Sequence, residues 1–554
     1  MRMVRITAAL LLVSVIALGP RDVGAATTVS VRDTGATGDG VTDDTAAIQR
    51  AIDAVGDAGS VLFPPGTYRL TQIRIGSRIA LVGAAAGAVT LQNTEPTGRN
   101  FSGMVTSAPS AGLVTDVEIR NLTFERTVET DAFDEHVYLE NCGRIVIERS
   151  RFVGRITRGQ HAQKGVHLRG CRYARILNNV FEDIPDNGLA LNWLDTATVS
   201  GHHVVSGNVF VRTSTDPASQ IVVTQSDVTV AANAFHGPAA GDPAGNWIET
   251  GPANGAVISA LTLTANTVRG MGSLVHDVNG LAAVANVLHN ATLNVDAVEG
   301  RSADVAFVGN VATGGGFLRA KRADHVLIEG NVVTGSMRDG ITLQEASNVS
   351  ILGNRVRRAQ RSGLFVDATT GAVLVAGNAC DENGQAGLAD AAFGVLIRGV
   401  AELFLAGNVC PDTQVRAETQ RDGMGINATR RVALRDDATT GNRHGAYGEM
   451  SPPAETRRSD SAFDSTHDGM SPSHRLVITW SPPRLAAGTQ TVRTMALPGA
   501  EPGDLVLASF SRDLRGLQLS AYVPARNTVA IVLRNGTIDE ADIGAGRMKV
   551  QLMK

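Results

Sequence analysis

An asparagine recurs along the middle of the chain, each time after a run of apolar residues and with a further apolar residue one or two positions later, as in LNNVF, SGNVF and AANAF. The motif stands at Asn179, Asn208, Asn233, Asn266, Asn286, Asn310, Asn331, Asn354, Asn378 and Asn408. Successive members are 20 to 33 residues apart. A repeat of this length indicates stacked supersecondary units, which bury their apolar side chains against their neighbours.

The segments between the asparagines are too short for a strand plus a crossover helix, and they alternate apolar and polar residues, as in GITLQ at 340–344. Each unit is therefore a coil of short strands. The predicted fold class is all-β: a right-handed parallel β-helix with an N-terminal capping helix and a small C-terminal β module. Equivalent residues of stacked coils lie about 4.8 Å apart, so the asparagine side chains should hydrogen-bond along the stack.

The first 26 residues have the pattern of a secretory signal peptide, in which Arg2 and Arg5 precede an apolar run that begins at Ile6. The run is shorter than the roughly 20 residues of a spanning helix. We therefore expect no membrane span after signal cleavage, and a secreted or periplasmic protein. The formal net charge of -4 provides no basic field for nucleic acid, which is excluded as a partner.

After the signal, Ile48, Ala51, Ile52 and Val55 form the apolar face of a helix that would cap the open edge of the first coil. This segment contains DTGATGDGVTDDTAAIQ and, from Phe63 to Tyr68, FPPGTY. With the asparagine repeats, these stretches resemble the pectate-lyase-like superfamily of rhamnogalacturonases, sugar epimerase-like proteins and phage tailspikes. The resemblance implies the β-helix fold and a polysaccharide partner, but not one reaction, because members differ in chemistry.

The catalytic motifs of two groups in that superfamily are missing. The chain lacks the ordered NTD, DD, HG and RIK set of the galacturonan hydrolases and the DPHD motif of the mannuronan epimerases. No catalytic residue is therefore transferred by motif.

The domain boundaries follow from composition. Residues 27–445 are assigned to the β-helix, 446–473 to a Pro- and Ser-rich linker, and 474–554 to a β-sandwich-like module of five or more strands. The module resembles terminal modules of phage-tail proteins, which trimerise or bind glycans. A module with so little core gains stability by association, so we expect a homotrimer formed through it.

The four cysteines form two pairs. Cys142 and Cys171 are 29 residues apart, and Cys380 and Cys410 are 30 apart, so each pair should stack on adjacent coils. Two disulfides are expected in an oxidising compartment, although Cβ atoms about 4.8 Å apart exceed the usual separation of about 3.5–4.5 Å. Stacked free thiols are the alternative.

The same 29-residue offset predicts which side chains point outward on the strand after each variable loop. On three successive coils these are Tyr138 and Glu140, then His167 and Arg169, then Ala190 and Asn192. Elimination from a uronate needs a base for the proton alpha to the carboxylate and a cation for the developing enolate. His167 or Tyr138 is the candidate base, and Arg169 the cation.

Two further residues complete this first-choice catalytic site. Glu140 would hold the Arg169 guanidinium, and Asn192 would orient a substrate hydroxyl. The alternative is a solvated ladder with a cross-strand ion pair and no catalysis.

A second group of polar residues comes from later coils: Glu249, His276, Asp277, Asp296, Arg319, Lys321, Gln344, Glu345 and Asp367. Carboxylates on adjacent or next-adjacent coils would lie about 5 to 10 Å apart, as in glycosidases. The acidic residues of this group could instead bind calcium, although no contiguous loop with calcium-ligand spacing is present. The sequence establishes no cofactor. Trp193 and Trp247 are candidates for stacking on sugar rings, with core packing as the alternative.

These patterns predict a secreted enzyme that cleaves an acidic polysaccharide by β-elimination. The alternatives are a glycoside hydrolase with paired carboxylates and a non-catalytic glycan-binding or structural protein. An epimerase, which changes the stereochemistry of a uronate without cleavage, is a further alternative.

Overall fold

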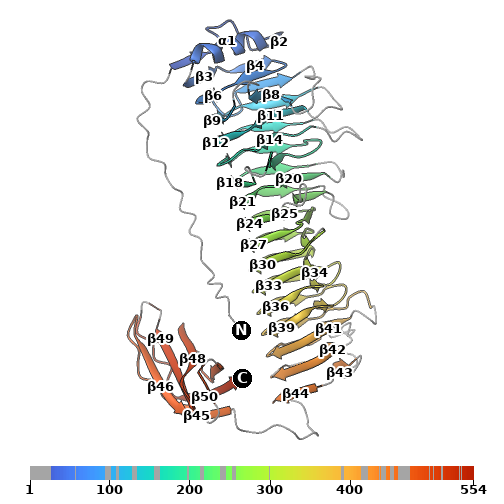
Figure 1. Cartoon of the computed structure of the whole chain (residues 1–554), viewed down its shortest axis with the longest axis vertical. Coiled ribbons are helices and arrows are strands. Elements are labelled where there is room, and N and C mark those ends of the chain that lie inside the picture. The colour runs from blue at the N-terminus through green and yellow to red at the C-terminus, as the bar shows by residue number, and fades with distance from the viewer. Residues whose placement is uncertain are drawn as a thin grey trace. The chain divides into compact units, whose positions relative to one another are not determined.

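The computed structural model shows a stack of parallel coils followed by a separate β module (Figure 1). The predicted signal peptide, residues 1–26, lies outside the described residues. The structure describes residues 27–553 except 57, 94–101, 108–111, 128–133, 155–162, 196–198, 213–217, 238–244, 252–256, 299, 388–391, 413–421, 436, 438–444, 450–454, 460–474, 498–499, 503, 513, 515, 536 and 538.

Each coil contributes a strand to three faces, which we call A, B and C. Face A consists of β1 (Thr27–Ser30), β3 (Gly59–Phe63), β6 (Ile79–Gly83), β9 (Val114–Arg120), β12 (Cys142–Glu148), β15 (Arg175–Leu177), β18 (Ser200–Ser206), β21 (Ser226–Ala231), β24 (Ile258–Thr264), β27 (Val278–Val284), β30 (Ser302–Val308), β33 (Ala323–Glu329), β36 (Ser347–Leu352) and β39 (Thr370–Ala376).

Face B follows face A along the chain. It consists of β2 (Asp39–Asp43), β4 (Gly66–Arg69), β7 (Val89–Asn93), β10 (Thr123–Arg126), β13 (Arg151–Val153), β16 (Val180–Glu182), β19 (Val209–Val211), β22 (Ala234–His236), β25 (Thr267–Arg269), β28 (Val287–His289), β31 (Val311–Gly315), β34 (Val332–Ser336), β37 (Arg355–Arg357) and β40 (Ala379–Asp381).

Face C precedes face A in each coil. It consists of β5 (Ile73–Ile75), β8 (Ser102–Ser107), β11 (Asp134–Glu140), β14 (Val166–Arg169), β17 (Leu189–Asn192), β20 (Ser219–Val223), β23 (Asn246–Thr250), β26 (Gly272–Leu274), β29 (Thr292–Asp296), β32 (Phe317–Lys321), β35 (Ile341–Gln344) and β38 (Leu364–Asp367). The long strands β41 (Phe393–Ala406) and β42 (Asp422–Arg435) cross from face C to face A.

The asparagines line the corner between faces A and B and are at most 2% exposed. Each Nδ2 donates to the Oδ1 of the asparagine on the next coil at 2.9 to 3.1 Å, and Asp437 accepts from Asn408 at the last rung. The predicted β-helix and its structural asparagine ladder are confirmed.

An aromatic ladder runs through the core along face B. The stacked rings of Phe124, Phe152, Phe181, Phe210 and Phe235 have centroids 4.7 to 5.0 Å apart. Trp247 ends this ladder, tilted by 57° against Phe235. These rings occupy equivalent inward positions, which keeps neighbouring coils in one register.

The predicted capping helix is α1 (Thr45–Val55), which buries Ala47, Ile48, Ala51, Ile52 and Val55. Its contacts are with β1, β3 and β5, the first strands of the stack. A carboxylate holds the turn before it: Asp44 accepts hydrogen bonds from the backbone amides of Thr37 at 2.7 Å and Gly38 at 3.0 Å.

One disulfide joins adjacent coils, between Cys142 and Cys171. The expected second disulfide is not formed, because Cys380 and Cys410 are free, buried thiols. They do stack: Cys380 donates its amide to the Val409 carbonyl at 2.8 Å, and a thiol hydrogen bond links the two side chains. Cys380 and Cys410 therefore form the stacked free thiols that the sequence left open as the alternative to a second disulfide.

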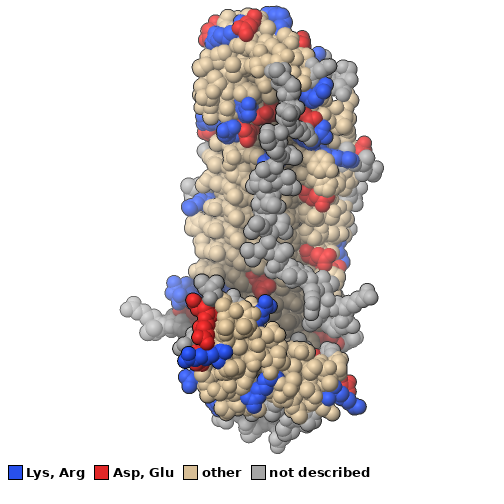
Figure 2. Space-filling view, turned by 90° about the vertical axis from the view of Figure 1, so that its left-hand side faces the viewer, with Lys and Arg blue, Asp and Glu red and all other residues tan. Residues whose placement is uncertain are grey.

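From β18 onwards, the central outward-facing row of face A carries no charged residue. It runs, in register, through Val204, Thr229, Thr262, Ala282, Ala306, Leu327, Ser350, Leu374 and Phe404. Figure 2 shows this side of the stack, with few coloured atoms over its middle. Charged outer residues of face A lie on earlier coils or beside this row, as in the ion pairs Arg144–Asp116 and Arg301–Asp324. On face C, both outward-facing rows carry charged residues.

The chain divides into two compact units, Met1–Ala462 and Phe463–Lys554. The linker prediction for 446–473 is wrong at its start, because β43 (Gly445–Glu449) and β44 (Glu455–Ser459) pair in parallel with β42 and extend the stack. No helix in the described part of the chain is long and apolar enough to cross a membrane.

The C-terminal module consists of two antiparallel three-stranded sheets over one apolar core that includes Trp480, Ile531 and Met548. The first sheet contains β45 (Arg475–Trp480), β50 (Gly546–Met553) and β47 (Leu505–Phe510). The second contains β46 (Gln490–Ala496), β49 (Thr528–Asn535) and β48 (Leu517–Ala525).

Candidate functional site

The first-choice residues lie together on face C, in the register that the 29-residue offset predicts. Tyr138 pairs with His167 and Glu140 with Arg169 between β11 and β14, and Arg169 pairs with Asn192 of β17. The rings of Tyr138 and His167 meet edge to face, with centroids 5.2 Å apart.

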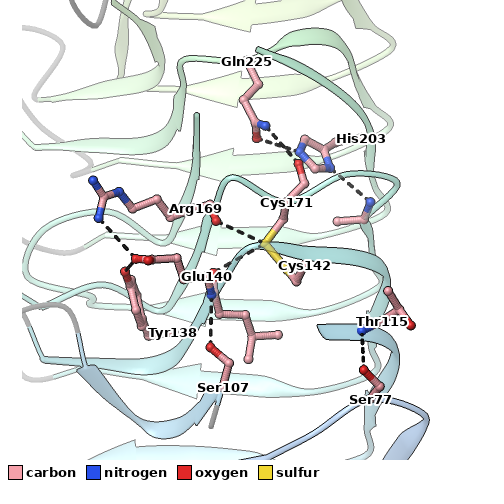
Figure 3. The surroundings of a disulfide bond; sticks show 12 residues. Ser77, Ser107, Thr115, Tyr138, Glu140, Cys142, Arg169, Cys171, His203 and Gln225 are labelled. Atoms are coloured by element: carbon pink, nitrogen blue, oxygen red, sulfur yellow. Dashed lines mark hydrogen bonds and ion pairs between the residues drawn. A yellow bond between two sulfur atoms is a disulfide. The ribbon is translucent and has the colours of Figure 1, made fainter. Parts of the chain in front are cut away.

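Glu140 joins the two coils through hydrogen bonds. Its Oε2 accepts the Tyr138 hydroxyl and, at 3.2 Å, the Arg169 Nη1 (Figure 3). The side chains of Arg169 and Glu140 are 35% and 38% exposed, whereas Tyr138 and His167 are only 5% and 4% exposed. A ligand on face C therefore meets the Arg169–Glu140 pair first.

The disulfide lies directly beside this cluster. Cys142 and Cys171 each follow Glu140 and Arg169 by two residues, so the covalent bond and the ion pair join the same two coils (Figure 3). Beyond it, the Gln225 amide donates to the Cys171 carbonyl at 2.9 Å, and His203 contacts Gln225 at 2.8 Å. The candidate site thus lies on coils that are joined to each other and to the next coils by a disulfide and several hydrogen bonds.

A buried ionic layer at the start of β11 was not predicted from the sequence. Asp134 binds Arg126 through two hydrogen bonds, of 3.0 and 3.2 Å, and both side chains are fully buried. Glu135 Oε1 lies 3.0 Å from His167 Nδ1. His136 lies between the backbone carbonyls of Val153 at 3.0 Å and Lys164 at 3.3 Å.

The sequence signal for this layer is the run Asp134, Glu135, His136 just before the alternating VYLE segment. Three consecutive ionisable residues at a buried strand start are unusual, because each requires a partner. The alternation rule gave them no inward or outward assignment, and so they were missed.

Burial changes the pKa values in the cluster. It raises the pKa of Glu135 to about 9 and lowers that of His167 to about 3, with the nearby charges of Lys164 and Arg169 further disfavouring the imidazolium. Burial and the bond to Glu140 raise the pKa of Tyr138. At neutral pH, Glu135 is protonated, while His167 and Tyr138 are uncharged.

Within the second group, Asp296, Arg319, Lys321, Gln344 and Asp367 lie on four neighbouring coils of face C, whereas Glu249 lies apart from them. Arg322 donates to Asp296 at 2.9 Å, and Arg319 donates to Gln344 at 3.3 Å. Lys321 stands in register between Asp296 and Gln344, and Gln344 is followed by Asp367. Glu249 lies two strands before β29 and accepts the Ser219 hydroxyl at 2.5 Å.

Two of the predicted substrate-binding residues have structural roles instead. Asp277 is 3% exposed and accepts the backbone amides of Val298 and Gly300, so it holds a turn. Trp247 is fully buried, and its Nε1 donates to the Thr292 carbonyl at 3.1 Å. Trp193 is half-buried at the end of face C and stays a prediction for sugar stacking.

Calcium binding, the alternative role of the acidic residues in the second group, also stays a prediction. Within the described ranges, no three His, Cys, Asp or Glu side chains are grouped so that they could hold a metal ion.

Comparison with known proteins defines the class of this fold. Residues 28–271 match the family model described as rhamnogalacturonase A/epimerase, pectate lyase-like, and residues 251–399 match the right-handed β-helix region model. The chain belongs to the pectate-lyase-like superfamily of right-handed parallel β-helices.

Curated relatives match a short part of the chain. Mannuronan C5-epimerase AlgE1 from Azotobacter vinelandii is 43% identical over 89 residues, which is 14% of this chain and 6% of the relative. Alginate lyase 7 from the same organism is 38% identical over 89 residues, 14% of this chain and 10% of the relative. The chain thus matches only a small fraction of these relatives' length.

Among solved structures, the pre-mature gene product 12 of bacteriophage phi29 is similar, with a TM-score of 0.51 and 14% identity. The match covers 80% of this chain and 58% of that protein. At this identity the similarity shows the fold alone.

Proposed function

We propose that this protein is an exported enzyme that acts on a uronate-containing polysaccharide along face C, and that it abstracts the proton alpha to a uronate carboxylate. The observation that carries the proposal is the adjacency of His167, Tyr138 and the Arg169–Glu140 pair on two neighbouring coils. A base and a cation at one place are what proton abstraction from such a carbon requires.

The roles follow from charge and exposure. Arg169, which is partly exposed, would bind the uronate carboxylate, with Glu140 fixing the guanidinium orientation. His167 is neutral and can accept a proton on a ring nitrogen that carries no hydrogen, whereas the raised pKa of Tyr138 makes a phenolate base unfavourable. A carboxylate bound at Arg169 would offset its positive charge and raise the pKa of His167 towards a more effective base.

The names of the relatives support the same first step. A mannuronan C5-epimerase and an alginate lyase both act at a uronate carbon that must lose its proton. Return of the proton to the opposite face gives epimerisation, whereas loss of the glycosidic oxygen gives elimination. We favour elimination as the outcome and keep epimerisation as the second candidate.

The test uses the purified protein and a panel of acidic and neutral polysaccharides. Ultraviolet absorbance of the new double bond reports elimination, solvent deuterium at C5 without cleavage reports epimerisation, and new reducing ends without absorbance report hydrolysis. His167→Gln should lower the rate of either proton-abstraction reaction by about 10²–10⁴-fold. His289→Gln, an exposed histidine of face B, is the matched control and should leave the rate unchanged.

Two outcomes contradict the proposal. Reducing ends alone would move the activity to a pair of carboxylates, and binding without any reaction would favour a glycan-binding protein. The homotrimer through the C-terminal module is a separate proposal, which sedimentation of the whole chain tests.

A further inference from the structure

The contact between Glu135 and His167 connects a side chain of the candidate site to one buried behind it. Glu135 is 0% exposed, and its Oε1 lies 3.0 Å from His167 Nδ1. The Glu135 backbone is held in place as well, because its carbonyl accepts a hydrogen bond of 3.0 Å from the buried Arg126. This geometry fixes the carboxyl group against one ring nitrogen of His167.

The hydrogen bonds of Glu135 indicate which atom carries the proton. An ionised carboxylate accepts about four hydrogen bonds, and leaving such a group buried without them is costly. Among the described residues, Glu135 Oε2 is buried without a hydrogen-bond partner. The neutral acid, which needs only one acceptor for its O–H group, fits this environment, and His167 Nδ1 is that acceptor.

We propose that Glu135 is a positioning residue that sets the tautomer of His167. As a neutral acid it donates to Nδ1, so the imidazole hydrogen lies on Nε2 and this nitrogen is a donor. As a carboxylate it accepts from Nδ1–H, which leaves Nε2 without a hydrogen and able to accept one. His167 can therefore act as a base through Nε2 only after Glu135 has lost its proton. The inference rests on the proposed function of His167.

Several charged groups surround Glu135 and His167 and affect the pKa values of both side chains. Lys164, paired with Asp186, and Arg126, paired with Asp134, favour the Glu135 carboxylate, while Asp134 opposes it. On the side of His167 stand Arg169, paired with Glu140, and the neutral ring of Tyr138. His136, the residue after Glu135, stays neutral because burial lowers its pKa to about 3.

The first test is the pH profile of the reaction. Because the pKa of Glu135 is raised to about 9, the wild-type kcat/KM should rise about tenfold per pH unit below that value. Glu135→Gln has no proton to lose, and its profile should lack this rise. Glu125→Gln on face B, where Glu125 accepts from Gln92 at 3.1 Å, is the matched control and should retain it. An unchanged profile in Glu135→Gln overturns the proposal.

The second test does not depend on activity. Long-range proton–nitrogen NMR of the histidine-labelled protein distinguishes the tautomers, and the His167→Gln variant assigns the signal. Wild-type His167 should carry its hydrogen on Nε2 near neutral pH and shift to Nδ1 as Glu135 ionises, whereas in Glu135→Gln the tautomer should not change with pH.

A hydrogen on Nδ1 at neutral pH in the wild type overturns the proposal even if Glu135→Gln does not fold. If the tautomer switches but no substrate reacts, the proposed function fails and the positioning role stands. If substrate reacts but the tautomer does not switch, the positioning role fails and the proposed function stands.

Discussion

At the scale of single residues, buried histidines make the protein sensitive to acid. Burial lowers the pKa values of His136 and His167 to about 3 and that of His203 to about 4. As the pH falls, the histidines of the unfolded chain bind these protons near their ordinary pKa of 6.5, well before those of the folded chain do. The stability that the neutral rings contribute is therefore complete above about pH 6.5 and is lost as the pH falls towards 4.

His203→Gln tests this acid sensitivity. The glutamine does not titrate, so the free energy of unfolding of the variant should fall less than that of the wild type between neutral pH and about pH 5. The expected difference is up to about 1.4 kcal/mol per pH unit, from urea denaturation at each pH. Parallel pH dependence in the two proteins would contradict the prediction.

Glu135 should have the opposite effect on stability. The folded chain keeps this proton up to about pH 9, whereas the unfolded chain releases it near 4.5. Stability is thus fully present below about pH 4.5 and declines as the pH rises towards 9. Glu135→Gln should therefore gain stability relative to the wild type between about pH 5 and 8, which thermal unfolding at both pH values measures. A constant difference would contradict the raised pKa.

At the scale of elements, substitutions in the asparagine ladder should destabilise the β-helix most. Asn310 donates through Nδ2 to Ala283 and Asn331, and its Oδ1 accepts from the amide and the side chain of Asn286. Asn310→Ala should cost about 3 kcal/mol or more, because several buried groups lose their partners at once. Asn279→Ala, at an exposed position of strand β27, is the control and should cost little. Equal midpoints of urea denaturation would contradict this.

The disulfide should matter locally as well as globally. Cys142→Ser with Cys171→Ala removes the covalent bond beside Arg169 and Glu140. A native disulfide of this kind stabilises by about 2–4 kcal/mol, chiefly through the unfolded chain. We expect that loss in the free energy of unfolding, and a normal melting temperature in the double variant would contradict it. Cys380→Ala is a comparison that removes a buried thiol from the other pair.

These pairings between neighbouring coils could be predicted from the sequence, because the spacing of the repeat gives the register of the strands. An offset of 29 residues correctly placed Tyr138 beside His167 and Cys142 beside Cys171. It did not predict Glu135, because the first residues of β11 depart from simple alternation and are all buried. For Trp247 the sequence left sugar stacking and core packing open, and core packing holds, since both it and Ile248 are buried at the end of the aromatic ladder.

At the scale of the whole molecule, the stack should tolerate the loss of a complete coil. Residues 287–310 contain one strand of each face and run from just after one ladder asparagine to the next. Their deletion brings Asn286 to Val311, which preserves the motif and lets Asn286 bond with Asn331. In a solenoid, stability is mainly a sum over nearest neighbours, so this variant should fold with a nearly unchanged melting temperature.

Deletion of 287–296 is the matched control. It removes the strands of faces B and C but leaves β30, so the coils lose register and the melting temperature should fall markedly. Circular dichroism and thermal unfolding compare both variants with the wild type. Similar damage from both deletions would show that the coils are not interchangeable units.

The unequal length of the coils has a consequence over evolutionary time. Spacings from 20 to 33 residues leave the ladders in register because the additional residues lie in the segments that enter and leave face C. Insertions there change the borders of that face while the asparagine and phenylalanine ladders stay in place. Related chains can therefore change what binds at face C one segment at a time, while the stacked coils and their ladders stay the same.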